Sequence, residues 1–300
     1  MRKKQFIRWF GLGCLAFCLA CSDDSSWVES ATQLHLSVSI SNDPMTKGLV
    51  EQGFFEDGDE IGVFLQGMAS TSYEGQSFDN LLFTAVGSGE GQSWSGGPVL
   101  LSSAKAKAFC YWPYGSATAE NYTEYPISAS DQIDYLYSGW TTNISNANPN
   151  IVVQMNHALT AIQFNVYRGS YTGVGNLTAV SVSSEGLGAS GKLNLADGSL
   201  SAVSLGEISL SGLDATLNNS TAYSAKILAL PYGATAKPIT GMFTIDGRNY
   251  ALNLSVSEAF MAGTKYIFDI VHDGVQLVVQ QVRVTQWSDS GVDQELNPVL

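Results

Sequence analysis

The chain has few charged residues, and basic residues are the scarcer kind. Of its 300 residues, 14% are charged, with 14 Lys and Arg against 27 Asp and Glu, so the formal net charge is −13. A surface of this sign repels phosphate backbones, which argues against nucleic acid as a partner. Low charge combined with 45% hydrophobic and 11% aromatic residues is typical of a β-rich extracellular protein and not of a disordered acidic tail.

Cysteine and histidine are also scarce. Three of the four cysteines lie within residues 1–21, which leaves Cys110 without a partner for an internal disulfide. Period-2 alternation around Cys110 indicates a small buried side chain. His35, His157 and His272 are widely spaced, and no pair has zinc-ligand spacing. No Gly-x-Ser-x-Gly elbow occurs with a suitable histidine and acid. We therefore predict no catalytic residues, no metal and no cofactor.

The one long apolar run lies at the N-terminus. Arg2, Lys3, Lys4 and Arg8 precede an apolar stretch from Trp9 to Ala20, too short to span a membrane but typical of a secretory signal, here residues 1–20. Ala20-Cys21 resembles a bacterial lipobox, which implies a lipidated Cys21; an ordinary secreted signal is the alternative. The Ser-Asp-Asp that follows resembles the surface-export tag of Bacteroidota lipoproteins, which implies an outward-facing anchor in the outer membrane.

The rest of the chain alternates apolar and polar residues with a period of two. Residues 34–40 and 162–166 show this pattern clearly, as half-buried strands do. A loop-like stretch at 168–173 separates two β-rich halves. We therefore predict an all-β protein of two tandem antiparallel β-sandwiches, at residues 21–168 and 169–300.

Three Asp-Gly pairs, at residues 197, 246 and 273, predict two-residue hairpin turns in the second half. Such turns set the register of the flanking strands. The predicted opposite pairs are all apolar: Leu195 with Leu200, Leu193 with Ala202, Phe243 with Tyr250, Ile270 with Leu277, and Phe268 with Val279.

Aromatic residues gather in the first half. Trp94, Trp112, Tyr114 and Trp140 are candidates for a platform that stacks against sugar rings. Packing in the core and at strand ends is the competing interpretation. On the sugar-binding interpretation, the protein is a monomeric surface lipoprotein that binds glycans.

Several segments together resemble the fimbrillin family, the type V pilins of Bacteroidota. They extend over essentially the whole mature chain. They are Thr46-Lys47 and the stretches 55–64 (FEDGDEIGVF), 108–114 (AFCYWPY), 156–166 (NHALTAIQFNV), 262–270 (AGTKYIFDI) and 284–287 (VTQW). The resemblance implies two transthyretin-like domains without enzymatic activity. It also implies export as a lipoprotein, cleavage after a basic residue, and polymerisation by donor-strand exchange with other fimbrial subunits, of the same or a different kind. A host or bacterial surface ligand is a further implied partner.

That mechanism requires a removable strand and a cleavage site. The candidate strand is 34–40, with Leu34, Leu36, Val38 and Ile40 facing inward. Removal of such a strand exposes unpaired backbone groups and an apolar groove, which a strand from a neighbour can fill. Lys47, before Gly48, is the only Lys or Arg between Arg8 and Lys105. An ordinary loop lysine is the alternative interpretation of Lys47.

The candidate donor segment is C-terminal. It combines Val282 and Val284 with the tail residues Leu296, Val299 and Leu300. An intramolecular strand that completes the second sandwich is the alternative. The sequence leaves open whether the chain is a shaft, tip or anchor subunit.

Overall fold

The computed structural model describes residues 32–40, 55–89, 92–287 and, for the backbone, 295–298. Throughout these residues the chain forms strands and two short 3-10 helices, Tyr122–Glu124 and Ala129–Asp131, and no α-helix. The all-β prediction is confirmed. No helix in this part of the chain is long and apolar enough to cross a membrane.

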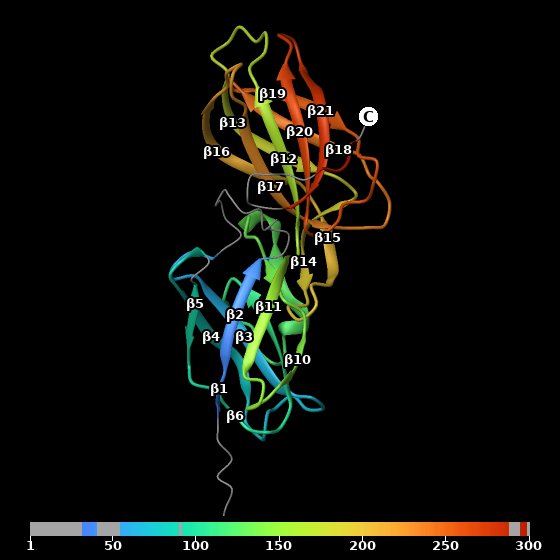
Figure 1. The fold of residues 1–300 in the computed structure, drawn as a ribbon. Coiled ribbons are helices and arrows are strands. Elements are labelled where there is room, and N and C mark those ends of the chain that lie inside the picture. The colour runs from blue at the N-terminus through green and yellow to red at the C-terminus, as the bar shows by residue number, and fades with distance from the viewer. Residues whose placement is uncertain (1–31, 41–54, 90–91, 288–294, 299–300) are drawn as a thin grey trace, which may run out of the picture.

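The N-terminal half is built on an eight-stranded sheet with the order β2-β11-β9-β7-β3-β4-β5, to which β10 is added on β7. A separate ribbon pairs β1 with β6 at the lower end of the molecule (Figure 1). The strands are β1 (Thr32–Gln33), β2 (His35–Ile40), β3 (Glu60–Gly67), β4 (Phe78–Val86), β5 (Ser93–Gly96), β6 (Leu100–Leu101), β7 (Ala106–Trp112), β9 (Leu136–Tyr137), β10 (Thr141–Ile144) and β11 (Asn150–His157). Strands β2 and β5, the two ends of the order, contact each other, so this sheet curls around its core.

The C-terminal half contains a second eight-stranded sheet, β15-β14-β17-β12-β20-β21-β22 with β8 on β14, and a four-stranded sheet, β16-β13-β18-β19. The strands are β8 (Tyr125–Ser128), β12 (Thr160–Tyr167), β13 (Asn176–Ser183), β14 (Leu187–Leu193), β15 (Leu200–Leu205), β16 (Ile208–Thr216), β17 (Tyr223–Pro231), β18 (Ile239–Ile245), β19 (Arg248–Leu254), β20 (Thr264–His272), β21 (Leu277–Gln286) and β22 (Glu295–Pro298). Side chains such as Phe164, Phe243 and Phe268 pack together in the core of this half.

Pairing is antiparallel except at two places: β2 runs parallel to β11, and β12 runs parallel to β20. The second pair shifts the boundary between the halves. Strand β12, which the predicted boundary at 168 assigns to the N-terminal domain, lies between β17 and β20 in the C-terminal sheet. The chain first reaches the C-terminal sheet at β8, which pairs with β14, and returns to the N-terminal sheet at β9. It crosses again at Ala158 and Leu159, which are buried and carry no turn signal. The loop-like stretch at 168–173 instead connects two strands within the C-terminal half.

The Asp-Gly hairpins agree with the sequence prediction in one case of three. At Asp246-Gly247 both residues have positive φ, 48° and 73°, and Phe243 lies opposite Tyr250 as predicted. At Asp273 the first pair is His272 with Leu277, so the loop has four residues, and Ile270 lies opposite Val279 and Phe268 opposite Val282. The predicted register is wrong there: the partner of Ile270 is shifted by two positions, and that of Phe268, beyond a bulge between Asp269 and Ile270, by three, although both new partners are apolar.

The register predicted for the hairpin at Asp197-Gly198 is also wrong. Leu193 pairs with Leu200, which leaves residues 194–199 as the loop, so Leu195 does not lie opposite Leu200. Leu195 is buried, and its backbone N–H donates to the carbonyl of Tyr122 at 2.8 Å. This contact with a distant part of the chain draws the loop inward, and a local turn signal cannot anticipate it.

Candidate functional site: the N-terminal edge strand

Strand β2 lies at an edge of the N-terminal sheet. Its single neighbour in the strand order is β11, and the two are in register from His35 beside Asn150 to Ile40 beside Met155. At its start, the Leu34 N–H donates to the Val99 carbonyl at 2.9 Å, and β1 pairs with β6. An edge strand can leave with the loss of one ladder of hydrogen bonds, whereas a central strand would lose two.

The side chains of β2 alternate as the sequence predicts. Leu34 is 5% exposed, and Leu36, Val38 and Ile40 are half-buried against the core of this half. His35, Ser37 and Ser39 face solvent. Leu36 is the register partner of Ile151, and Val38 that of Val153. The inward side chains of β2 therefore cover an apolar row on β11.

The size of this contact can be compared with the stability of a domain. Full burial of one such aliphatic side chain is worth about 1.5–3 kcal/mol. Three of the four are only half-buried, so their sum is on the order of 5 kcal/mol. Domains are stable by about 5–15 kcal/mol in total. Loss of β2 without a replacement would therefore remove a large share of the stability of this half.

The structure does not describe the predicted processing sites. The signal at residues 1–20, Cys21, Lys47 and Gly48 are all outside the described residues, as are Val299 and Leu300. The removable leader that the cleavage site implies, residues 21–47 with the first strand, is described only in its 32–40 part.

The C-terminal candidates are divided between two strands. Val282 and Val284 lie in β21, opposite Phe268 and Tyr266 of β20. The backbone of Leu296 lies in β22, which pairs with the other side of β21 at residues 283–285 and is the edge strand of the C-terminal sheet. In the described residues, both parts of the candidate donor segment therefore belong to the chain's own sheet.

One contact at the junction of the halves was not anticipated from the sequence. His157 ends β11 and stacks on Trp287 with ring centroids 4.3 Å apart and planes at 7°. His157 Nδ1 lies 2.7 Å from a carboxylate oxygen of Asp134, and the Lys226 ammonium group lies 5.3 Å from the Trp287 ring. Strand β11, the neighbour of β2, is thus in contact with Trp287, the residue after which the C-terminal tail begins. The motif 284–287, which ends at Trp287, could be singled out from the sequence, but the sequence carries no sign that His157 contacts this tryptophan.

The four aromatic candidates do not form one platform. Trp94 and Trp112 are half-buried and both pack against Phe55, with ring centroids 5.2 Å and 6.3 Å from it. Trp140 packs edge-on against Phe109 and beneath the Lys107 ammonium group. Because Phe109 and Trp112 are an odd number of residues apart on β7, they face opposite sides of that sheet. Tyr114 is exposed just beyond the end of β7.

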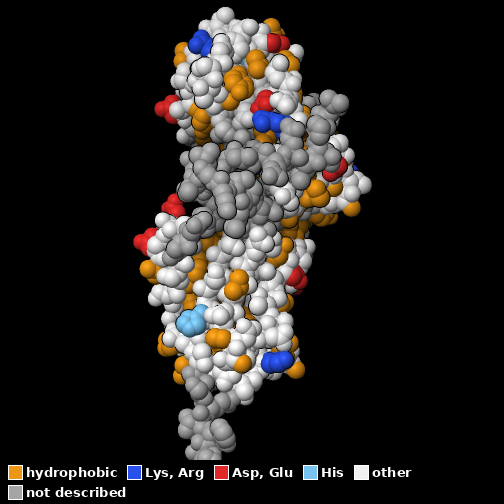
Figure 2. Space-filling model, viewed as in Figure 1, with side chains coloured by type: hydrophobic (Ala, Val, Ile, Leu, Met, Phe, Trp, Pro, Cys, Tyr) orange, Lys and Arg blue, Asp and Glu red, His pale blue; other side chains and the backbone are white. Residues whose placement is uncertain are grey.

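The described part of the chain contains one cysteine and no cluster of metal-ligating side chains. Cys110 is fully buried, and burial raises the pKa of its thiol to about 12, which keeps it protonated and unreactive. Within the same residues no group of three or more His, Cys, Asp or Glu is placed to hold a metal ion. Charged side chains are sparse on the face shown in Figure 2, and the few Lys and Arg are scattered.

Comparison with known proteins supplies a family and a fold. A family model described as fimbrillin-like matches residues 46–287. A crystal structure of a candidate cell adhesion protein from Bacteroides uniformis is similar with a TM-score of 0.65 at 19% identity, covering 87% of this chain and 99% of that one. A second, from Bacteroides ovatus, has a TM-score of 0.63 at 14% identity, covering 85% and 97%. A third, from Bacteroides fragilis, has a TM-score of 0.52 at 15% identity, covering 87% and 100%. No curated protein matches the sequence.

Proposed function

The chain belongs to the fimbrillin-like family, and from that premise we propose that it is a structural subunit of a cell-surface fimbrium that supports adhesion. In this proposal the subunit is exported as a lipoprotein, anchored in the outer membrane through Cys21, and cut between Lys47 and Gly48. The segment before the cut, including β2, then leaves. A strand from another fimbrial subunit, of the same or a different kind, takes its place.

The observation that carries the proposal is the placement of β2. It is an edge strand, it is held by one neighbour, and its inward side chains cover an apolar row on β11. A groove left by this strand would present both unpaired backbone groups and apolar side chains, and an extended strand satisfies both. The replacement strand therefore needs apolar residues at alternate positions, to match Leu34, Leu36, Val38 and Ile40.

The donor strand is the second part of the proposal. Because β21, with Val282 and Val284, lies between β20 and β22 while β22 is an edge strand, we assign donation to the tail after Trp287, with Leu296, Val299 and Leu300 as the apolar contacts; β22 would leave β21 when it is donated. The role is structural and not enzymatic, and it needs no cofactor.

Limited proteolysis tests the proposal. The chain from Ser22 onward is treated with trypsin, and the Lys47→Gln variant serves as the matched control. We expect cleavage before Gly48, loss of the peptide that contains β2, and SDS-resistant oligomers from the parent chain only. A chain that is cut at Lys47 and loses the peptide, yet remains monomeric alone and with candidate partner subunits, would contradict the proposal. Mass spectrometry of the protein from its native surface would show whether it starts at acylated Cys21 or at Gly48.

A further inference from the structure

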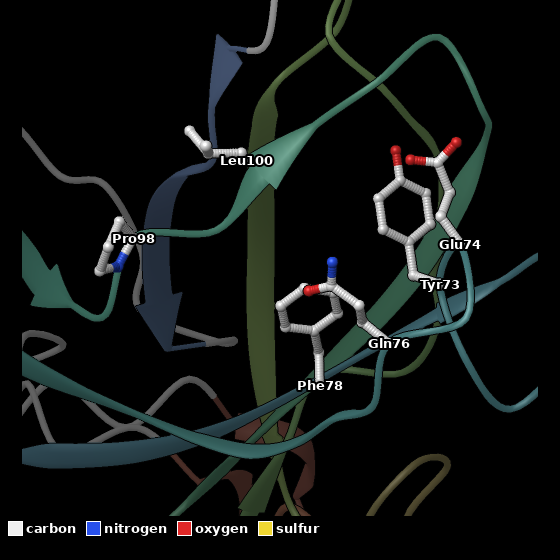
Figure 3. A pocket seen from close by; sticks show the side chains of 6 residues that line it. All are labelled: Tyr73, Glu74, Gln76, Phe78, Pro98 and Leu100. Atoms are coloured by element: carbon white, nitrogen blue, oxygen red, sulfur yellow. The ribbon is translucent and has the colours of Figure 1, made fainter.

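A small hollow lies at the end of the N-terminal half that carries β1 and β6 (Figure 1). Its volume is about 190 Å³, and its lining residues are Tyr73, Glu74, Gln76, Phe78, Pro98 and Leu100. Figure 3 shows Pro98 and Leu100 on one side of the hollow, and Tyr73, Gln76 and Phe78 on the other. Leu100 is 60% exposed, which is unusual for a leucine within a paired strand. The hollow is therefore partly apolar and open to solvent.

The wall of this hollow is held firmly. The Tyr73 hydroxyl donates to the Ala104 carbonyl at 3.0 Å and accepts from the Ser102 N–H at 3.0 Å. The backbones of Tyr73 and Gln76 bond to each other in both directions. A rigid hollow loses little conformational entropy when it is filled.

The opposite end of the molecule presents apolar side chains on loops. The β20–β21 hairpin and the β12–β13 connection both reach the upper end in Figure 1. Val275 on the hairpin is 84% exposed, and Val174 on the connection is 68% exposed. We call these two loops, residues 168–175 and 273–276, the upper tip.

Hydrogen bonds hold the Val275 loop in one shape. The Asp273 carboxylate accepts from the N–H groups of Val275 and Gln276, each at 2.9 Å. The Gly274 N–H donates to His272 Nδ1 at 3.1 Å. The valine is thus presented at low entropic cost.

The neighbouring loop is fixed in the same way. The Asp246 carboxylate accepts from the N–H groups of Gly175 and Asn176, at 3.0 and 2.8 Å. Arg168 donates to the Gly173 carbonyl at 2.6 Å. The Ser170 N–H donates to the His272 carbonyl at 2.9 Å, which ties this loop to the hairpin. Val174 and Val275 therefore belong to one preorganised surface.

We propose that the upper tip of one copy of this chain docks into the hollow of a second copy. An apolar cavity of roughly 150 Å³ is large enough for a benzene molecule, so a hollow of this size can take a valine side chain. Charge is also complementary: Glu74 is exposed at the rim of the hollow, and Arg248 is exposed at the hairpin next to the tip. Two acids lie at or beside the tip, and both accept hydrogen bonds from backbone N–H groups: Asp246 from Gly175 and Asp273 from Val275.

The consequence is a row of subunits. A contact between opposite ends of identical chains is heterologous, so each bound copy leaves one end free and the row continues. Its relevance rests on the proposed function as a fimbrial subunit, where it would align neighbours before strand exchange. The contact buries little area, so we expect weak and reversible association.

Sedimentation velocity of the uncleaved Lys47→Gln chain, from Ser22 onward, tests this inference over a range of protein concentrations. This Lys47→Gln chain, the parent of the variants below, should associate reversibly. Val275→Asp in the tip and Leu100→Asp in the hollow should each weaken association at least tenfold. Val152→Asp, at a valine that is 70% exposed on β11, is the matched control and should leave association unchanged.

Mixing the two variants gives the decisive result. Val275→Asp keeps an intact hollow and Leu100→Asp keeps an intact tip, so the mixture should form one-to-one dimers and nothing larger. Because Leu100 lies in β6, Glu74→Arg serves as a second hollow variant, and its defect should be reversed by mixing with Arg248→Glu.

Absence of association in the parent, equal weakening by Val152→Asp, or monomers in both mixtures would overturn the inference. Because the chain is uncut in every arm, such a failure leaves the trypsin experiment on strand exchange unaffected.

Discussion

Several ionisable side chains of this protein are buried in their neutral forms. Burial raises the pKa values of Tyr111, Tyr135 and Tyr266 to about 12, from the ordinary 10.0. Burial likewise raises the pKa of Cys110 to about 12. The Tyr111 hydroxyl donates to Asn80 and the Tyr266 hydroxyl to the Ala259 carbonyl, contacts that require the protonated phenol. These groups resist ionisation because the phenolate or thiolate would lose its water.

The raised pKa values predict alkaline destabilisation. In the unfolded chain the same groups lose protons near their ordinary pKa values, 9.0 for cysteine and 10.0 for tyrosine, so their contribution to stability is complete only well below pH 9 and is lost as the pH rises towards about 12. We expect the free energy of unfolding in urea to be flat from about pH 7 to 8, to begin to fall near pH 9 and to fall steeply above about pH 10. Phenolate absorbance should show a tyrosine population that titrates near pH 12 only while the chain is folded. Titration of every tyrosine near pH 10 in the folded chain would contradict this.

Among elements, β2 is the one whose attachment the proposed function depends on. Val38→Asp would place a carboxylate against Val153, whereas Ser37→Asp changes the outward face of the same strand. We expect Val38→Asp to cost about 2–4 kcal/mol of unfolding free energy. It should also increase hydrogen exchange at the β11 amides that pair with β2. Ser37→Asp should stay within about 0.5 kcal/mol of the parent. Equal exchange in the two variants would show that β2 does not protect β11.

The sequence anticipated this strand because its signal is local. Alternation at residues 34–40 fixes which side chains face inward, and the structure agrees at each position. The Asp246-Gly247 turn was predicted for the same reason, since two positive φ angles in succession favour that pair. Patterns of this kind need no knowledge of distant contacts.

Elements governed by distant contacts were predicted less well. Leu195 is drawn into the core by a bond to Tyr122, more than seventy residues earlier, so the hairpin register changed. Strand β12 joins the C-terminal sheet through a parallel pair with β20, about a hundred residues later. The stacking of His157 on Trp287 is of the same kind. Period and turn chemistry carry no information about such partners.

At the scale of the whole molecule, the two halves meet where β11 contacts the end of the C-terminal sheet. The groove strand β11 ends at His157, which stacks on Trp287 at the end of β21. The covering strand β2 lies in one half, and β22, the C-terminal strand, lies in the other. In the proposed assembly, a subunit would accept a strand beside β11 and offer its C-terminal tail to a neighbour, which is what a polymer requires.

In the proposed mechanism, β2 must leave before subunits exchange strands. Ser37 and Val152 are register partners on the exposed face of β2 and β11. Partners on neighbouring strands lie about 5 Å apart, within the range of a disulfide. The double variant Ser37→Cys and Val152→Cys should therefore lock the strand when oxidised and free it when reduced.

The measurement is oligomer formation by this double variant after trypsin, on SDS gels, with and without reductant. The account predicts that the oxidised protein is cut at Lys47, keeps its N-terminal peptide and stays monomeric, and that reduction releases the peptide and restores the SDS-resistant ladder. Either single-cysteine variant should form the ladder in both conditions. A ladder from the oxidised double variant as strong as that from the reduced one would contradict the account.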